Sequence, residues 1–214
     1  MSIKLNAQSG GSVALDAPTQ TTSSADNVYK LPVADGSAGQ VLQTDGSGNL
    51  SWVTLPSAGL TMHDNWYVGG SLSPANGTHY ITSNWTRNTN TEAGSIGSAM
   101  TESSGVFTFP STGIYKIDFN GGFYVSANAV YNYLGFGIFT TLDNSNYSKR
   151  IETYQAAPAS ANNYVMAPVS YVFDVTNTTN CKVRLSTISD GTGTNLIDVG
   201  GRYGQVFFTK LGET

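Results

Sequence analysis

The clearest alternation of apolar and polar positions in the chain lies in the stretch GVFTFPSTGIYKIDF, residues 105–119. Beyond its central turn, Tyr115, Ile117 and Phe119 fall on one face of an extended strand, and charged residues fall between them. Pro110 lacks the N–H that a strand interior needs, so it ends the preceding apolar strand. The pattern predicts two strands joined by a tight corner, with an apolar face that a second sheet must cover.

Short strand patterns bounded by turn residues recur from residue 59 to the last residues of the chain. We expect strands at residues 65–68, 79–84, 106–109, 113–125, 133–142, 148–155, 167–175, 181–188 and 204–211. No segment shows a sustained period of 3.6 residues, so essentially no helix is predicted. Many short strands separated by Gly, Asn and Asp turns predict an all-β, antiparallel sandwich of the jelly-roll kind.

The first 58 residues have a different pattern, because large apolar residues are sparse and irregular there. Short strands are expected at residues 2–5 and 12–15, and QVLQT and LSWVT form a hairpin around a glycine-rich loop at residues 46–49. This segment is too thin to bury a core of its own. We therefore expect an extended N-terminal attachment or stem segment at residues 1–58 and a separate head domain at residues 59–214.

The composition of the 214 residues is unusual, with only 11% charged residues, 24 glycines and 12 tyrosines. With so few charges, hydroxyl and amide groups must make most of the contacts with water. A surface of this composition suits a particle or an oligomer. The net charge of −4, without a basic patch, argues against nucleic acid as a partner. No secretory signal and no apolar run of about 18 residues are found, so membrane insertion is not expected. The single cysteine, Cys181, is interpreted as a small buried residue.

Catalysis finds little support in the sequence, and we predict neither an enzyme nor a cofactor. The two histidines, His63 and His79, belong to no zinc or nucleophile motif. Glycoside hydrolysis needs two carboxylates roughly 5 to 9.5 Å apart. The acidic residues are scattered along the sequence and do not indicate such a pair, so a small glycan hydrolase is kept as the third interpretation. Asp190 and Asn195 could bind Ca²⁺ within the loop DGTGTN, but the full ligand spacing is absent and a plain turn is preferred.

Three short motifs in the N-terminal segment carry a resemblance to a known class of proteins. They are a GGSV-L-AP element at residues 10–18, LP-ADG-AGQVL at residues 31–42 and TDGSG-LSW at residues 44–52. This arrangement resembles the N-terminal module of bacteriophage tail-fibre and virion-appendage proteins. The resemblance implies a virion protein, made in the host cytoplasm, whose N-terminal segment contacts other virion proteins or leads into a trimeric stalk.

A second resemblance lies in the head domain. The pattern G-x-F-x-x-P-x-x-G-x-Y falls on Gly105, Phe107, Pro110, Gly113 and Tyr115, and the chain closes on the strand YGQVFFTKL. Both features resemble the jelly rolls of complement globular heads and tumour necrosis factor-like proteins. The resemblance implies a compact homotrimer packed about a threefold axis.

The last strand indicates how such a trimer would pack, because both of its faces are apolar. Val206 and Phe208 fall on one face, and Phe207 and Leu211 fall on the other. One face then belongs to the sandwich core and the other faces a neighbouring chain. A second two-faced strand at residues 133–142 completes the set of expected trimer contacts, which is Tyr133, Phe136, Ile138, Phe207 and Leu211.

The polar loops at residues 143–147, 156–164 and 189–195 are expected together at the distal end of the head. Tyrosine offers an apolar ring and a hydroxyl to a sugar, and asparagine adds uncharged donors and acceptors. The candidate receptor-binding residues are Tyr147, Tyr154, Tyr164, Asn144, Asn146, Asn162 and Asn163. The sequence therefore predicts a short tail fibre or fibre tip that adheres to a host-surface glycan or protein receptor. The alternative is a head fibre or capsid decoration protein with a structural role.

Overall fold

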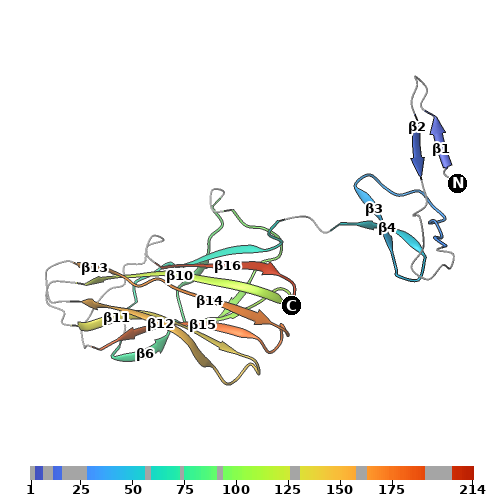
Figure 1. Ribbon diagram of the computed structural model, residues 1–214. Helices are drawn as coiled ribbons and strands as arrows, with labels where there is room; N and C mark the ends of the chain where they lie inside the picture. Colours follow the sequence, from blue (N-terminus) through green and yellow to red (C-terminus); the bar gives the residue numbers. More distant parts are fainter. Residues whose placement is uncertain are drawn as a thin grey trace. The chain divides into compact units, whose positions relative to one another are not determined.

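The computed structural model describes residues 3–6, 12–15, 28–55, 59–72, 75–90, 94–125, 131–157, 163–190 and 204–214. The chain divides into two compact units, Met1–Ala58 and Gly59–Thr214 (Figure 1). We call the second unit the head. None of the described residues is helical, so no helix in that part of the chain is long and apolar enough to cross a membrane.

The N-terminal unit consists of two antiparallel strand pairs. β1 (Ile3–Asn6) pairs with β2 (Ser12–Leu15), and β3 (Gln40–Thr44) pairs with β4 (Leu50–Thr54). The β3–β4 hairpin confirms the strands predicted from QVLQT and LSWVT. The indole Nε1 of Trp52 donates to the carbonyl of Ala34 at 3.0 Å, but none of the side chains described between residues 28 and 55 is buried. This agrees with a segment that has little core of its own.

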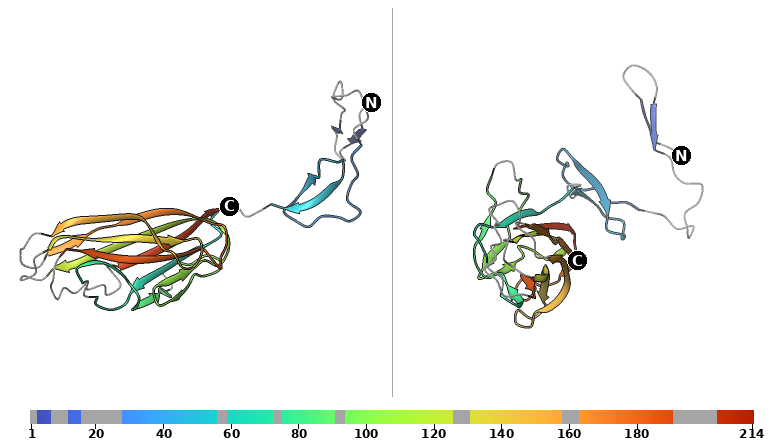
Figure 2. Two further views of the ribbon diagram at one scale, coloured as in Figure 1. Left: turned by 90° about the horizontal axis from the view of Figure 1, so that it is seen from below. Right: turned by 90° about the vertical axis from the view of Figure 1, so that its left-hand side faces the viewer.

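The head is a sandwich of two antiparallel sheets, whose strands run side by side along its length in the left-hand view of Figure 2. Sheet I has the order β13 (Asn163–Met166), β10 (Gly113–Val125), β16 (Gly204–Gly212), β5 (His63–Val68) and β7 (Trp85–Arg87), and β14 (Val169–Val175) also pairs with β10. Sheet II has the order β12 (Ser148–Ala157), β11 (Tyr131–Thr141), β15 (Lys182–Ser189), β9 (Val106–Thr108) and β8 (Thr101–Ser103), and β6 (Gly77–Tyr80) pairs with β15. The all-β jelly-roll fold expected from the sequence is confirmed.

Most of the expected strands are present, and the differences have local causes. The expected strand at residues 79–84 stops at Tyr80, and Asn84, with a φ of 65°, turns the chain into β7. The strand expected to begin at residue 167 begins at Val169, because Pro168 cannot donate to the ladder and divides β13 from β14. β7, β8 and β13 were not predicted, since three or four residues are too few to show a period.

The core lies between the two sheets and is rich in aromatic rings. Tyr115, Ile117 and Phe119 on β10 are completely or almost completely buried, which confirms their alternation with polar residues. Across the sandwich, the Phe136 ring lies 4.8 Å from the Phe119 ring, centroid to centroid. Cys181 is buried, as expected.

The trimer contact predicted for Phe136 and Ile138 is wrong. Their exposed fractions are 1% and 0%, and both belong to the core of their own chain. The alternation of β11 turns these side chains inward, against sheet I. They therefore have no surface to offer to a neighbouring chain.

Candidate functional site

The outward face of sheet I carries large apolar side chains. Val206 and Phe208 are fully buried in the core, whereas Phe207 is half-buried and Leu211 is 53% exposed, so the predicted division of β16 into two faces is confirmed. Phe207 stacks on the His63 ring of β5, with centroids 6.0 Å apart. Val172 on β14 is 50% exposed on the same side of the sheet. This surface, which we call the apolar face, spans β5, β16, β10 and β14.

Polar groups on the apolar face are mostly paired within the chain. Lys116 Nζ lies 3.0 Å from Asp118 Oδ1, and His63 Nδ1 lies 2.9 Å from the Thr209 hydroxyl. The exception is Asn65, whose Oδ1 is buried and has no hydrogen-bond partner among the described residues. The face therefore has few unpaired charges to desolvate if another chain covers it.

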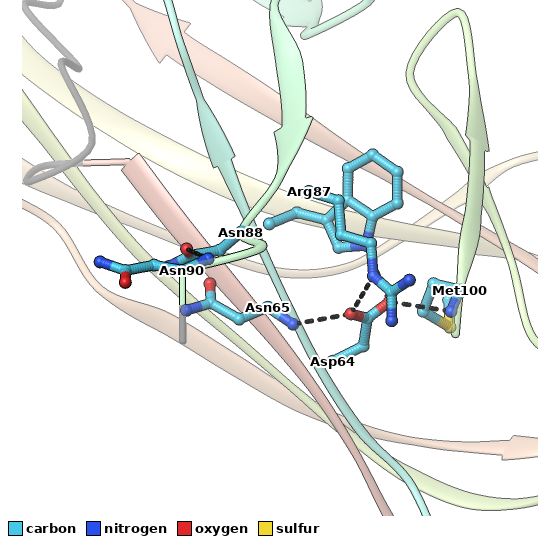
Figure 3. Close-up of polar contacts among 7 residues, drawn as sticks. Asp64, Asn65, Arg87, Asn88, Asn90 and Met100 are labelled. Carbon is cyan, nitrogen blue, oxygen red and sulfur yellow. Dashed lines mark hydrogen bonds and ion pairs between the residues drawn. The ribbon is translucent and has the colours of Figure 1, made fainter. Parts of the chain in front are cut away.

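Beneath the apolar face, a buried carboxylate fastens the edge of sheet I (Figure 3). Asp64 is fully buried and accepts four hydrogen bonds, from Arg87 Nε at 2.8 Å, Trp66 Nε1 at 2.9 Å, and the backbone N–H groups of Met100 at 2.9 Å and Asn65 at 3.1 Å. Two of these hydrogen bonds lie within β5, one joins β5 to β7, and one joins β5 to Met100, the residue before β8. The arrangement satisfies a buried charge and is structural.

The outward face of sheet II has a different form, because it is hollowed. A hollow of about 260 Å³ is lined by Thr78, Tyr133, Lys149, Glu152, Tyr154 and Ile188. The Tyr133 and Tyr154 rings lie 5.3 Å apart and are tilted by 42°. Lys149 Nζ donates to Glu152 Oε2 at 2.6 Å. The hollow thus combines aromatic rings with one paired set of charges.

Two glycines on β11 allow its neighbours to pack closely beside this hollow. Gly135 pairs with Tyr154 on one side and with Ile188 on the other, and Gly137 pairs with Glu152. A Cβ at Gly135 would lie 2.0 Å from the Thr153 carbonyl oxygen, so no larger residue fits without a shift of the backbone. The strands therefore approach each other closely at Gly135. Tyr133 lies on this face, away from Phe207 and Leu211.

Tyr147, one of the candidate receptor residues, is packed against an arginine. The Arg184 guanidinium carbon lies 4.8 Å from the Tyr147 ring centroid and 4.9 Å from the Tyr80 ring centroid. The Tyr80 ring also meets Phe139 edge-on at 5.1 Å. Burial raises the pKa of the half-buried Tyr147 hydroxyl. The ring is engaged within its own chain, as a partner of Arg184.

Asn146 is likewise engaged, in the turn between β11 and β12. Its side-chain amide donates to Asp143 Oδ2 at 2.7 Å, and its backbone N–H donates to Asp143 Oδ1 at 2.7 Å. The hydrogen bond from the Asn146 side chain, followed by one from the Thr141 hydroxyl, holds the pKa of Asp143 well below its ordinary value. Asn144 is exposed, with a φ of 58°, and its N–H donates to the Asn180 carbonyl at 2.9 Å.

The three loops expected together at one end of the head begin at opposite ends of the sheets. The turn at residues 143–147 follows Thr141, which pairs with Lys182 at the start of β15. Ser189, the last residue of β15, pairs with Leu134 near the other end of β11. Antiparallel pairing therefore separates the first loop from the other two, and the expectation of a single distal surface is wrong. Asn162 and Asn195 lie outside the described residues.

The remaining candidates lie at the end of the head that contains Ser189. Asn163 pairs with Val125, and Tyr164 pairs with Tyr124, with their rings 5.2 Å apart. The Asp190 carboxylate accepts hydrogen bonds from the Asn132 side chain at 2.6 Å and from the Asn132 and Tyr133 N–H groups at 2.8 and 3.0 Å.

Burial raises the pKa of Asp190, but the hydrogen bonds from Asn132 and Tyr133 outweigh it, so the pKa lies below its ordinary value. These donors occupy the carboxylate that was the candidate Ca²⁺ ligand. The described residues hold no group of three His, Cys, Asp or Glu side chains placed to bind a metal ion.

No protein-family model and no curated protein sequence matches this chain. Among solved structures, murine APRIL at pH 5.0 superposes with a TM-score of 0.51 and 12% sequence identity, covering 70% of this chain and 98% of the APRIL chain. A second neighbour, the Eiger TNF of S. frugiperda, has a TM-score of 0.45 and 11% identity, with coverage of 72% and 95%. At such identities, the likeness to APRIL establishes the fold alone.

The head is a jelly roll of the tumour necrosis factor type. The apolar face and the hollow both lie in the head. The fold by itself does not assign either of them a role.

Proposed function

We propose that the head is a homotrimer and forms the receptor-binding tip of a bacteriophage short tail fibre. The observation that carries the proposal is the apolar face of sheet I, where Phe207, Leu211 and Val172 stand outward from the sandwich. They lie on β16 and β14, on either side of the Lys116–Asp118 ion pair of β10, and outward apolar side chains beside paired charges are typical of a protein interface.

Copies of the same chain are the occupants that fit this face best. Its ion pair, Lys116–Asp118, is already made within the chain, so the charge that the face offers to a partner is small and comes chiefly from the exposed Asp174 carboxylate on β14. The unpartnered, buried Asn65 Oδ1 would be satisfied by a donor from a neighbouring chain. Jelly rolls of the family that the sequence resembles assemble as trimers, and the apolar face lies on a strand, β16, that the resemblance includes.

Adhesion is supported by what remains exposed when sheet I is covered. The outward face of sheet II would stay accessible on all three chains, with its hollow and the exposed Tyr154 ring. Threefold display converts weak single contacts into firm attachment. The N-terminal motifs at residues 10–18, 31–42 and 44–52 support attachment of the other unit to a phage particle.

The trimer is tested by Phe207→Lys. The wild-type chain should sediment as three chains at micromolar concentration. The variant should sediment as one folded chain, because the trimer would bury three lysines away from water, whereas in a monomer each lysine stays hydrated on the surface. Circular dichroism checks that the fold is kept.

Tyr154→Lys is the matched control, since it places the same charge on an exposed aromatic position of sheet II. It should leave the trimer intact. A wild-type monomer, or a Phe207→Lys trimer, would contradict the proposed assembly.

The adhesive role is tested by competition. Purified wild-type protein, added to host bacteria before the phage, should reduce phage adsorption, and the monomeric Phe207→Lys variant should reduce it much less. Phage particles that lack the protein, yet adsorb normally and fall apart more readily, would instead indicate a capsid decoration or head fibre. Labelling the protein on virions in the electron microscope gives its position directly.

A further inference from the structure

The hollow on sheet II has the chemistry of a small carbohydrate site. We propose that it binds one neutral hexose unit of a glycan, stacked on Tyr154 and hydrogen-bonded by Glu152. The inference deepens the proposed adhesive function and rests on it for its biological setting. The binding itself is a property of this face and can be measured apart from any phage.

The aromatic side of the hollow forms an open corner. Tyr154 is 55% exposed, and the Tyr133 ring, 5.3 Å away and tilted by 42°, backs it. The contact with Tyr133 limits the side-chain freedom that Tyr154 would lose on binding. A ring held in this way offers its outer surface to the C–H face of a sugar, and its hydroxyl to the sugar's oxygens.

The polar side of the hollow is suited to a neutral ligand. Lys149 donates to Glu152 Oε2 at 2.6 Å, and the two side chains are 43% and 32% exposed. The pair carries no net charge, and Glu152 Oε1 can accept from a sugar hydroxyl while Lys149 donates to a neighbouring oxygen. An acidic sugar would meet the Glu152 carboxylate and would have to compete for Lys149.

The size of the hollow indicates a single ring. Its volume of about 260 Å³ is just below the range of about 300–1,000 Å³ typical of pockets for drug-sized ligands. Ile188, which is 5% exposed, supplies an apolar base to the hollow. An extended peptide would need a longer groove with pockets for alternate side chains.

The position of the hollow also fits repeated display. It lies on the sheet opposite the apolar face, so trimerisation through sheet I would leave three identical hollows accessible. Weak binding of one sugar at each hollow then suffices for attachment to a repeated surface glycan.

The test is a binding measurement on the full-length protein. The methyl glycosides of glucose, galactose and mannose, and N-acetylglucosamine, are each titrated and followed by saturation-transfer difference NMR, with N-acetylneuraminic acid as the acidic probe. At least one neutral sugar should bind with a millimolar Kd and receive saturation through its ring protons. The acidic sugar should bind more weakly.

Four variants locate the binding. Tyr154→Ala should weaken the affinity for the sugar by about 10-fold, because the stacking ring is lost. Tyr154→Phe keeps the ring and should lose far less affinity. Glu152→Ala should weaken binding by a similar factor. Tyr164→Ala removes an equally exposed tyrosine from the other sheet and should leave the affinity unchanged.

Three results would overturn the inference: no binding of any neutral sugar, stronger binding of the acidic sugar, or binding that Tyr154→Ala leaves intact. Sedimentation of each variant shows whether the trimer persists. If the protein is a trimer and blocks phage adsorption but binds no neutral sugar, the hollow is not the glycan site, and the proposed function still stands. If sugar binding depends on Tyr154 but the protein does not block phage adsorption, the hollow is a sugar site and the proposed adhesive function is wrong.

Discussion

Sheets I and II contribute the same kind of side chain to the core but differ in what they turn outward. Sheet I carries Phe207 and Leu211 on its outer side, whereas the middle of sheet II carries Gly135 and Gly137 there. The first arrangement places apolar side chains beside the Lys116–Asp118 ion pair, and next to the second lies a hollow that Tyr154 helps to line. Outward apolar side chains suit another protein chain, and a hollow with mixed chemistry suits a small ligand.

The two sheets also differ in how their three-residue edge strands are held, and this difference gives the largest expected effect. β7 of sheet I is fastened to β5 by the Arg87–Asp64 pair, whereas β8 of sheet II pairs with β9 in a hairpin. Asp64→Ala leaves Trp66 Nε1 and the Met100 N–H without their acceptor. We expect a loss of about 3–5 kcal/mol in the free energy of unfolding, measured by urea denaturation.

Asp174→Ala is the matched control for that loss. Asp174 is an exposed carboxylate on the outward side of β14 in the same sheet. Its removal should change the free energy of unfolding by less than about 0.5 kcal/mol. Equal effects of the two substitutions would mean that the buried network does not hold the edge of sheet I.

A smaller effect is expected from filling the glycine positions of sheet II. Gly135→Ala places a methyl group against the Thr153 carbonyl and the Tyr154 backbone, so β11 and β12 must move apart. We expect a loss of about 1–3 kcal/mol in thermal or urea unfolding. Gly212→Ala, where the new Cβ meets nothing within 4 Å, is the control and should be nearly neutral. A neutral Gly135→Ala would show that the close approach of β11 and β12 does not require glycine.

The smallest expected effect concerns the hairpin turn beside β12. The folded pKa of Asp143 lies below its ordinary value, chiefly through the Asn146 side chain. The stability that this carboxylate contributes is therefore present above the unfolded pKa, near 3.9, and is lost as the pH falls through the folded pKa. Asn146→Ala should raise the pKa of Asp143 toward its ordinary value, as measured by carboxyl ¹³C NMR.

The control for this shift lies in the N-terminal unit. Asp45 in the β3–β4 turn also has a lowered pKa, chiefly through a hydrogen bond from the Asn49 side chain. Asn49→Ala should raise the pKa of Asp45 and leave that of Asp143 unchanged, and Asn146→Ala should do the opposite. A shift at both carboxyls in either variant would contradict these local causes.

The jelly roll could be predicted from the sequence because its signal is local. The alternation of Tyr115, Ile117 and Phe119 with polar residues defines one face of a strand within five residues. The sequence of the last strand alone likewise shows that both of its faces are apolar. Phe136 and Ile138 were misassigned for the same reason. A period of two separates the faces of a strand without saying which face is inward.

The candidate site was harder to predict, because its parts come from distant segments. Tyr133 and Tyr154 were both singled out, but as a trimer contact and a loop residue, since only the β11–β12 register brings them together. Tyr147 was interpreted as free because its partner, Arg184, lies on another strand. One feature of the sequence could have pointed to the Asp64 network: an aspartate within a strand that also carries aromatic residues.

The way the chain enters and leaves the head has a practical consequence. β5 begins at His63, which pairs with Thr209 near the end of β16, so the first and last strands of the head are neighbours in sheet I. Proteins whose termini lie close together tolerate circular permutation. A short linker from Thr214 back to Gly59 would close the head into a continuous ring, and new termini could be opened in an exposed turn. Such rearranged heads would be compact building blocks for displaying peptides.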